Sequence, residues 1–335
     1  MSFTNVQRKI DKLKKEQMQT FSVIIPCYNA SSVIRRALEA LENQTYKDFE
    51  VIVIDDCSTD DSREVVKSCI EEMSISIRLL ENEKNSGPGF SRNRGIKEAQ
   101  GKYLCFLDSD DYFDTTYFDC LFRQLEKTDS DVVFFGICQV IGDKCRELSA
   151  LNYSKEEYLA LSLGSLCKFC SLRSLWDGIE MPTIKNAEDI AVIPVVLSRA
   201  KKITSIPQVL YYYIHSNASL SSNHKPEVSR NFITSFKYTE EHIDKTKYRE
   251  ELEFHGIKTI LYGATLNALK AKMNSEDIRN MWNEFIENYP YWYSNKYIQY
   301  YPKSKRMFLL FIKNNQLNLL KLYSSVHSML LRWFG

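Results

Sequence analysis

Apolar residues in the first third of the chain fall into short runs separated by stretches with helical spacing. The runs FSVIIPC at 21–27, FEVIVID at 49–55 and YLCFL at 103–107 are nearly continuous, which is typical of strands buried on both faces. After the first run, apolar side chains recur at the helical period, at Val33, Ile34, Ala37, Leu38 and Leu41. Strands alternating with helices at this spacing predict a mainly parallel sheet covered by helices on both faces.

The same alternation continues to about residue 136. We expect a helix over 62–73, a strand over 76–82, a short helix ending at Gly101, a helix over 115–127 and a strand over 131–136. Gly101 is expected to end its helix in the left-handed conformation. The chain is therefore predicted to be an α/β protein.

The two ends of the chain differ from this α/β region. Residues 1–20 are polar and charged, with Val6, Ile10 and Leu13 at helical spacing, and fit either an amphipathic helix or a frayed leader. From about residue 225 the sequence is helical in period and poor in glycine. We expect a leader over 1–20, an α/β domain over 21–224 and a helical region over 225–335.

Composition narrows the class of protein. The chain has 335 residues, 44% of them hydrophobic, and a net charge of +1, so no basic excess points to nucleic acid. Nine cysteines, several inside apolar runs, and no secretory signal predict reduced thiols in a cytoplasmic protein. The apolar runs are shorter than the roughly 20 residues that span a bilayer.

Carboxylates follow two of the predicted strands. Asp55 and Asp56 end one, and Asp108 and Asp110 follow another. Ligands of such sheets bind at the carboxyl ends of the strands. Crowded carboxylates raise one another's pKa, and a hard cation such as Mg²⁺ or Mn²⁺, bridging to a substrate phosphate, would relieve this. The alternative is that aspartates at strand ends only form turns.

A glycine-containing loop, GPGFSRNRG at 87–95, precedes the acidic strand end. It is neither a dinucleotide-binding fingerprint nor a P-loop. Arg92 and Arg94 could reach an anionic ligand at the rim, or could lie solvated on the surface.

Three ordered segments carry a resemblance to a known family: SVIIPCYNASSVIRRALEALENQTYKDFEVIVIDDCSTDDS, NSGPGFSRNRGI and GKYLCFLDSDDYF. They resemble the inverting, nucleotide-sugar-dependent glycosyltransferases of family 2. The match runs from about residue 21 to 135 and resumes in KFCSLRSLWDGIEMPTIKNAEDIAVIPVVLSRAKKI and LYYYIHSNASLS. The resemblance implies a GT-A fold, a nucleotide-sugar-binding domain with a mixed, mostly parallel central sheet.

The resemblance also implies a donor site. Its residues would be Pro26, Tyr28, Asn29, Asp56, Gly87, Arg92, Asp108 and Ser109, with Asp56 on the base, usually uracil. Cys57 stands where the family commonly has glycine, a change we expect to be tolerated.

A metal site is implied at the D-x-D motif. Asp110 would hold Mn²⁺ or Mg²⁺, and His215, in a segment with Ser219 and Ser221, would ligate the metal or contact the diphosphate. Ile214 replaces an arginine that is common there, which weakens the expectation for His215.

Glu188 and Asp189 match the family's ED motif, so the resemblance implies that Asp189 is the catalytic base. A sugar hydroxyl is a poor nucleophile at neutral pH and needs such a base. One-step displacement would invert the anomeric centre. An ordinary acidic first helical turn is the alternative.

The segment 288–335 contains no Asp or Glu. Its basic residues are Lys296, Lys303, Lys305, Arg306, Lys313, Lys321 and Arg332, and they are interspersed with Tyr and Trp. This composition suits docking to an anionic membrane, where a lipid-linked acceptor would reside. It equally suits a helical subdomain that packs on the catalytic domain or on a second subunit of a homo-oligomer.

Three classes of function remain open from sequence. The first is a glycosyltransferase that builds a surface polysaccharide of the capsule, exopolysaccharide, O-antigen or teichoic type, on a glycan or lipid-linked acceptor. The second is a D-x-D phosphatase or phosphotransferase, although this motif follows a later strand than that chemistry needs. The third is a non-catalytic relative that binds a nucleotide sugar or glycan.

Overall fold

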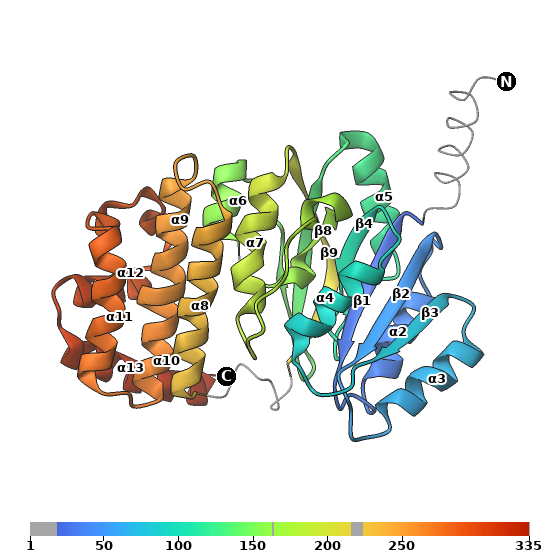
Figure 1. The fold of residues 1–335 in the computed structure, drawn as a ribbon, viewed down its shortest axis with the longest axis horizontal. Coiled ribbons are helices and arrows are strands. Elements are labelled where there is room, and N and C mark those ends of the chain that lie inside the picture. Colours follow the sequence, from blue (N-terminus) through green and yellow to red (C-terminus); the bar gives the residue numbers. More distant parts are fainter. Residues whose placement is uncertain (1–18, 163, 216–223, 335) are drawn as a thin grey trace. The chain divides into compact units, whose positions relative to one another are not determined.

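The computed structural model describes residues 19–162, 164–215 and 224–334 (Figure 1). The chain divides into two compact units. Unit 1 takes its described residues from Met1–Asn152, Leu166–Thr183 and Ala200–Ser216, and unit 2 from Tyr153–Ser165, Ile184–Arg199 and Asn217–Gly335. This division differs from the linear one expected, because two inner segments join the C-terminal helices. The predicted leader lies almost wholly outside the described residues.

Unit 1 is built on a nine-stranded mixed sheet in the order β3-β2-β1-β4-β8-β6-β9-β5, with β7 paired to β6. Its strands are β1 Phe21–Cys27, β2 Phe49–Asp55, β3 Ser76–Glu81, β4 Tyr103–Phe106, β5 Tyr112–Phe113, β6 Val132–Ile141, β7 Lys144–Leu148, β8 Phe169–Leu172 and β9 Ile203–Ile214. The half from β3 to β4 is parallel, whereas β8 is antiparallel to both its neighbours. The expected mixed sheet is confirmed.

The helices of unit 1 are α2 Ile34–Glu42, α3 Ser62–Glu72, α4 Pro88–Glu98 and α5 Tyr117–Thr128, with short 3₁₀ turns η1 Leu166–Lys168 and η2 Arg173–Trp176. Every residue of β2 is buried, as its unbroken apolar run predicts. The register pairs Cys27 with Asp55, so the ends of β1 and β2 lie side by side. The residues after these strands therefore meet at one edge of the sheet.

The expected role of Gly101 is wrong. Helix α4 ends at Glu98 with Ala99 as its cap, and Gly101 does not have a positive φ. A Cβ atom at Gly101 would lie 2.6 Å from the carbonyl carbon of Phe21 and from the nitrogen of Ser22. Glycine is required there because the chain passes directly against β1.

Unit 2 is helical. Its helices are α6 Lys155–Leu161, α7 Glu188–Arg199, α8 Pro226–His242, α9 Arg249–Gly256, α10 Thr265–Lys270, α11 Ser275–Asn288, α12 Lys303–Lys313 and α13 Leu317–Phe334, with a π-helix, η4, at Ile257–Ala264 and 3₁₀ turns η5 Trp292–Ser294 and η6 Lys296–Tyr300. Helix α7 packs along α8, and α6 packs on α9. The described helices include none long and apolar enough to cross a membrane.

Much of the aromatic C-terminal segment is core. Trp292, Tyr297 and Phe308 are at most 3% exposed. These three aromatic residues of the segment 288–335 therefore pack inside unit 2.

Two cysteines are joined. Cys138 on β6 and Cys145 on β7 form a disulfide, with Cα atoms 5.9 Å apart, and the other seven are free. The β6–β7 hairpin brings these two residues to disulfide distance, which the expectation of reduced thiols did not include.

Candidate functional site

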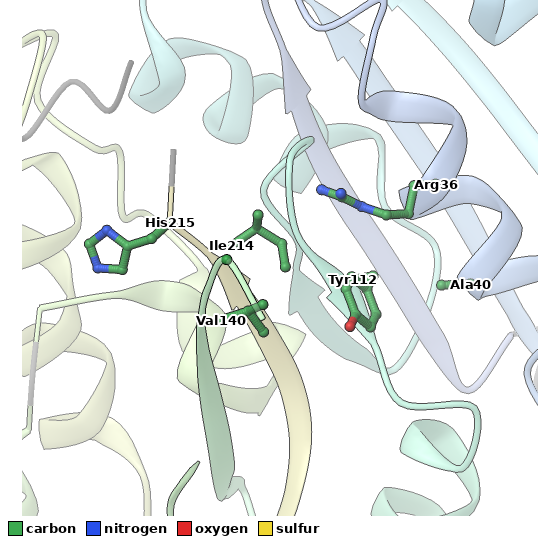
Figure 2. A pocket seen from close by; sticks show the side chains of 7 residues that line it. Arg36, Ala40, Tyr112, Val140, Ile214 and His215 are labelled. Atoms are coloured by element: carbon green, nitrogen blue, oxygen red, sulfur yellow. The ribbon is translucent and has the colours of Figure 1, made fainter. Parts of the chain in front are cut away.

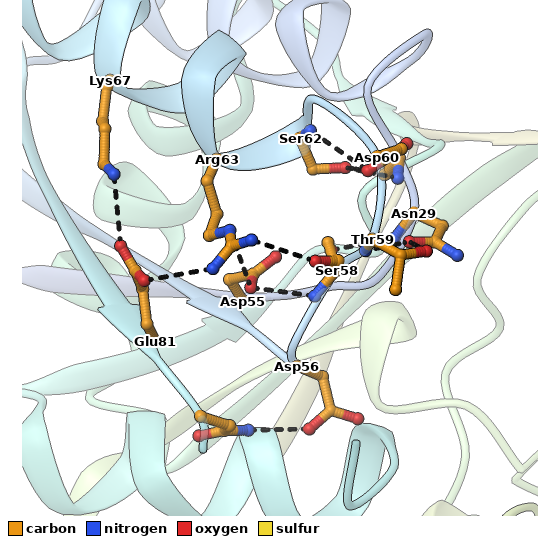
Figure 3. A network of polar contacts seen from close by, with 12 residues as sticks. Asn29, Asp55, Asp56, Ser58, Thr59, Asp60, Ser62, Arg63, Lys67 and Glu81 are labelled. Carbon is orange, nitrogen blue, oxygen red and sulfur yellow. Dashed lines mark hydrogen bonds and ion pairs between the residues drawn. The ribbon is translucent and has the colours of Figure 1, made fainter. Parts of the chain in front are cut away.

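The loops after β1 and β2 are tied together by polar contacts (Figure 3). The amide of Asn29 donates to the hydroxyl of Ser58 at 3.0 Å, and the amide of Thr59 donates to Oδ1 of Asn29 at 2.8 Å. The Asp60 carboxylate accepts hydrogen bonds from the amide of Ser31 and from both the amide and the hydroxyl of Ser62. Two predicted donor-site segments therefore form one rigid rim, on which Tyr28 is 48% exposed and Pro26 partly exposed.

Asp56 is buried at this rim and holds the turn before α4. Its carboxylate accepts from Nδ2 of Asn82 at 2.8 Å, from the amide of Ser86 and from the amide of Gly87 at 2.7 Å. Gly87 has φ +88°, a conformation that favours glycine. Both oxygens of Asp56 are thus engaged by the protein, so a contact to a nucleotide base would be an additional hydrogen bond.

Two non-glycine residues of the rim have left-handed backbone. Asn29 has φ +49° and Cys57 has φ +62°. Asparagine tolerates this region and cysteine does so less well. The conformation at Cys57 gives a physical reason for glycine in the pattern that this sequence resembles. A residue with a Cβ atom carries a cost in backbone strain in this conformation, and the tolerance of Cys57 stays a prediction.

The three carboxylates after β4 have three different surroundings. Asp108 pairs with Arg92, whose Nη2 lies 2.7 Å from its Oδ1. Arg92 is 7% exposed, so the solvated alternative for this arginine is wrong. Arg94 instead donates to the carbonyl of Glu81 and to Asn82.

Asp111 is fully buried and ties this loop to β9. Its oxygens accept from the hydroxyl of Tyr211 and from the amide of Ile214, the latter at 2.7 Å. Burial, and then the charge of Asp108, raise the pKa of Asp111 to about 8. Sequence reasoning missed this role, although a third carboxylate directly after D-x-D, followed by Tyr112 and Phe113 entering the sheet, was an available signal.

The carboxylate of Asp110 is held neither by an ion pair, as that of Asp108 is, nor by the hydrogen bonds that hold Asp111. In the described part of the chain no lysine, arginine or histidine forms an ion pair with its carboxylate. Burial, and then Asp108, raise its pKa. Ser109 lies between the two, partly exposed. A partly buried carboxylate beside a second one fits a hard divalent cation that also takes substrate oxygens.

His215 is not brought into that group. Its amide donates to the carbonyl of Val140 at 2.9 Å, and its exposed ring lies edge-on to Tyr213. Among the described residues no three His, Cys, Asp or Glu side chains form a metal site, and the imidazole of His215 turns away from Arg36 and Tyr112 (Figure 2). The residues Ser219 and Ser221 lie outside those described.

A cavity of about 510 Å³ opens on this side of unit 1. Arg36, Ala40, Tyr112, Val140, Gly142, Ile214 and His215 line it. Arg36 donates to the carbonyl of Asp110 and lies over the ring of Tyr112. Arg36 therefore supports the D-x-D loop from outside, a contact that sequence spacing did not indicate.

Glu188 and Asp189 begin α7 in unit 2. Ala187, just before them, has φ +68°. Its carbonyl accepts from the hydroxyl of Ser235, and the side chain of Asn231 donates to Asn186, so α8 holds the turn in place. Glu188 is buried and Asp189 is partly exposed. A strained backbone held by neighbouring contacts is a feature that clusters at functional sites.

Comparison with known proteins identifies the family. Residues 22–173 match the family model described as Glycosyl transferase family 2. Over 221 residues the chain is 30% identical to UDP-Glc:alpha-D-GlcNAc-diphosphoundecaprenol beta-1,3-glucosyltransferase WfaP of Escherichia coli, covering 64% of this chain and 84% of that enzyme. The chain belongs to glycosyltransferase family 2. This confirms the expectation of a glycosyltransferase and removes the phosphatase class.

A further family 2 relative is poly(ribitol-phosphate) beta-N-acetylglucosaminyltransferase TarS of Staphylococcus aureus. It is 30% identical over 208 residues, which are 58% of this chain and 35% of TarS, so the chain spans about a third of that relative. The crystal structure of TarS 1–349 in complex with UDP-GlcNAc matches with a TM-score of 0.70 at 21% identity, covering 92% of both chains. The GT-A fold is confirmed.

Proposed function

We propose that this chain transfers a sugar from a UDP-sugar to a hydroxyl group of a surface polysaccharide or of its lipid-linked precursor, with inversion. One observation carries the proposal. Asp108 is paired with Arg92, and Asp111 accepts hydrogen bonds from Tyr211 and Ile214. The carboxylate of Asp110 has neither kind of contact and no ion-pair partner among the described residues. The names of WfaP and TarS support a UDP-linked donor and an acceptor that contains phosphate.

On the donor side, we assign the diphosphate to the rim near Arg92, Asp108 and Asp110. Asp110 would hold Mn²⁺ or Mg²⁺, and such a cation neutralises a departing diphosphate when it is bound. Arg92 fixes Asp108 beside that position and Arg36 fixes the carbonyl of Asp110. Asn29 and Asp56 would border the nucleoside.

On the acceptor side, we assign Asp189 the role of general base. It lies in the first turn of α7, where the helix N-terminus favours its ionised form. Its Oδ1 accepts from the amide of Ile190 at 2.7 Å, which orients the carboxylate. A single base and one displacement would give an inverted product.

The test is release of UDP across a panel of UDP-sugars, with and without Mn²⁺. Asp110→Asn should lose metal-dependent UDP binding, while Asp189→Asn should bind UDP-sugar and not turn it over. Asp119→Asn, on α5 next to Arg123, serves as the control and should behave as wild type. Normal turnover by Asp189→Asn would remove that residue from its role. No hydrolysis, transfer or metal-dependent binding with any donor would favour the non-catalytic alternative.

We further propose that the C-terminal helices dock on the inner face of the cell membrane, with the transfer taking place in the cytoplasm. Met307, Leu310, Leu319 and Leu322 are between 39% and 62% exposed, among basic residues. Leu319→Asp with Leu322→Asp should reduce flotation with anionic liposomes, whereas Leu151→Asp, an equally exposed leucine of unit 1, should not. Unchanged flotation would oppose docking, and a change in oligomeric state on sizing would assign the surface to a second subunit.

A further inference from the structure

Unit 2 contains a cavity that the proposed transfer does not use. Its volume is about 220 Å³. Residues from α6, α7, α8, α9, the π-helix η4 and α12 contribute to its lining, and none of the described lining residues is acidic. It is smaller than the roughly 300–1,000 Å³ of pockets that hold whole ligands, so it suits one part of a larger molecule.

Two lysines enter this cavity without a counter-ion. Nζ of Lys258 donates to the carbonyl of Ser162 at 3.0 Å, and Nζ of Lys305 lies 4.6 Å from the ring centre of Tyr262 and 4.9 Å from that of Tyr301. Neither amine forms an ion pair within the described residues. Burial, and then the charge of Lys305, lower the pKa of Lys258 to about 7. An anion would relieve this repulsion.

The lining also includes a buried histidine. His255 is 3% exposed, and its Nδ1 has no partner among the described residues. The hydroxyl of Thr239 lies within hydrogen-bond distance of the carbonyls of Ala191 and Ser235 and of Nε2 of His255, the last at 3.2 Å. Burial lowers the pKa of His255, so its ring adds no positive charge beside the two lysines at neutral pH.

We propose that this cavity binds a phosphate group carried on a short hydroxylated or apolar carbon chain. A phosphate dianion balances the two ammonium groups of Lys258 and Lys305. The Tyr262 hydroxyl, whose pKa is raised to about 12 by burial, remains a donor at neutral pH. Phe254 and Ile193 provide apolar lining for the carbon chain of the ligand. The π-helix that presents Lys258 is a rare element that is frequent at functional sites.

The cavity shares a helix with Asp189. Ile190 and Ile193 of α7 line it, one and four residues after that aspartate. The bound phosphate is therefore assigned to the acceptor, an assignment that rests on the proposed function. The phosphate site itself does not depend on it.

The test is calorimetry on the full chain saturated with UDP, which occupies donor-side anion contacts. The probes are glycerol 1-phosphate, geranyl phosphate and, as a neutral comparison, glycerol. Wild type should bind at least one phosphate ester. Lys258→Met and Lys305→Met should each weaken that binding about tenfold or more, and Lys303→Met, on the same α12 but exposed, should change it less than twofold.

The outcomes separate the sources of the phosphate. Tighter binding of glycerol 1-phosphate indicates a polyol phosphate, and tighter binding of geranyl phosphate indicates a lipid phosphate. No binding of either ester, or equal binding by the Lys305→Met and wild-type proteins, overturns the proposal. UDP binding is recorded for every variant, so a defect in the donor site is distinguished from a defect in this cavity.

Discussion

Arg92 on α4 and Asp108 after β4 form an ion pair with 2.7 Å between Nη2 and Oδ1. The pair is largely buried on the arginine side, with the Arg92 side chain 9% exposed and that of Asp108 35% exposed. It fixes one carboxylate of the acidic loop, whereas Asp110 forms no such ion pair in the described part of the chain.

Removing this arginine should destabilise the fold. Arg92→Met leaves Asp108 unpaired beside Asp110, and we expect the free energy of unfolding to fall by about 2 kcal/mol in urea titrations. Arg94→Met, which loses hydrogen bonds to neutral acceptors only, should cost about 1 kcal/mol. If both variants lose the same free energy of unfolding, the ion pair with Asp108 stabilises the fold no more than the neutral hydrogen bonds of Arg94 do.

The two aspartates that follow should respond in opposite directions. Asp111→Ala leaves the Ile214 amide and the Tyr211 hydroxyl without their acceptor, and should cost about 3 kcal/mol. Asp110→Ala removes a like charge from Asp108 and should stabilise the apo protein by about 0.5–1 kcal/mol while abolishing transfer. Thermal unfolding measures both. A stability loss in Asp110→Ala as large as in Asp111→Ala would contradict this division of roles.

Cys57→Gly should raise stability. The left-handed backbone at this position strains any residue with a Cβ atom, and glycine removes that strain, a net gain of about 1 kcal/mol. Cys57→Ala keeps the Cβ atom and is the matched control, expected to be near neutral. If alanine and glycine stabilise equally, the thiol rather than the backbone is the cause.

Asp60 should make the free energy of unfolding fall at low pH. Burial alone would raise its pKa, but hydrogen bonds from Ser62 and Ser31 outweigh this and lower the pKa to about 2. Ionised Asp60 therefore contributes its full stabilisation of the fold above its unfolded-state pKa of 3.8, and this stabilisation is lost as the pH falls towards 2. The stability difference between wild type and Asp60→Asn should shrink over that range. Asp61→Asn, an exposed neighbour, should show no such change.

The sequence was sufficient for the elements that depend on local pattern. The buried run of β2 and the period of α2 predict their elements to within a residue or two, and the D-x-D motif follows β4 closely, at the carboxyl end of that strand. These features follow from side-chain burial and from the geometry of parallel strands.

The rest depends on contacts between distant segments. That α6 and α7 join the C-terminal helices is set by packing on α8 and α9, which no local period encodes. The close approach of Gly101 to β1 and the bonds of Asp111 to β9 likewise join residues about 80 to 100 positions apart. The cavity of Lys258 and Lys305 appears only once six elements have come together.

The carboxylate of Asp56 occupies amides at the start of α4 that could otherwise bind the diphosphate of a donor. The first amides of a helix usually attract anions because the peptide dipoles add up there. At α4 the amides of Ser86 and Gly87 already face Asp56, and Pro88 has no N–H to offer. Part of the positive end of that helix therefore faces a charge of the protein itself, and under the proposed function we expect guanidinium groups and a bound cation to compensate the charge of a pyrophosphate.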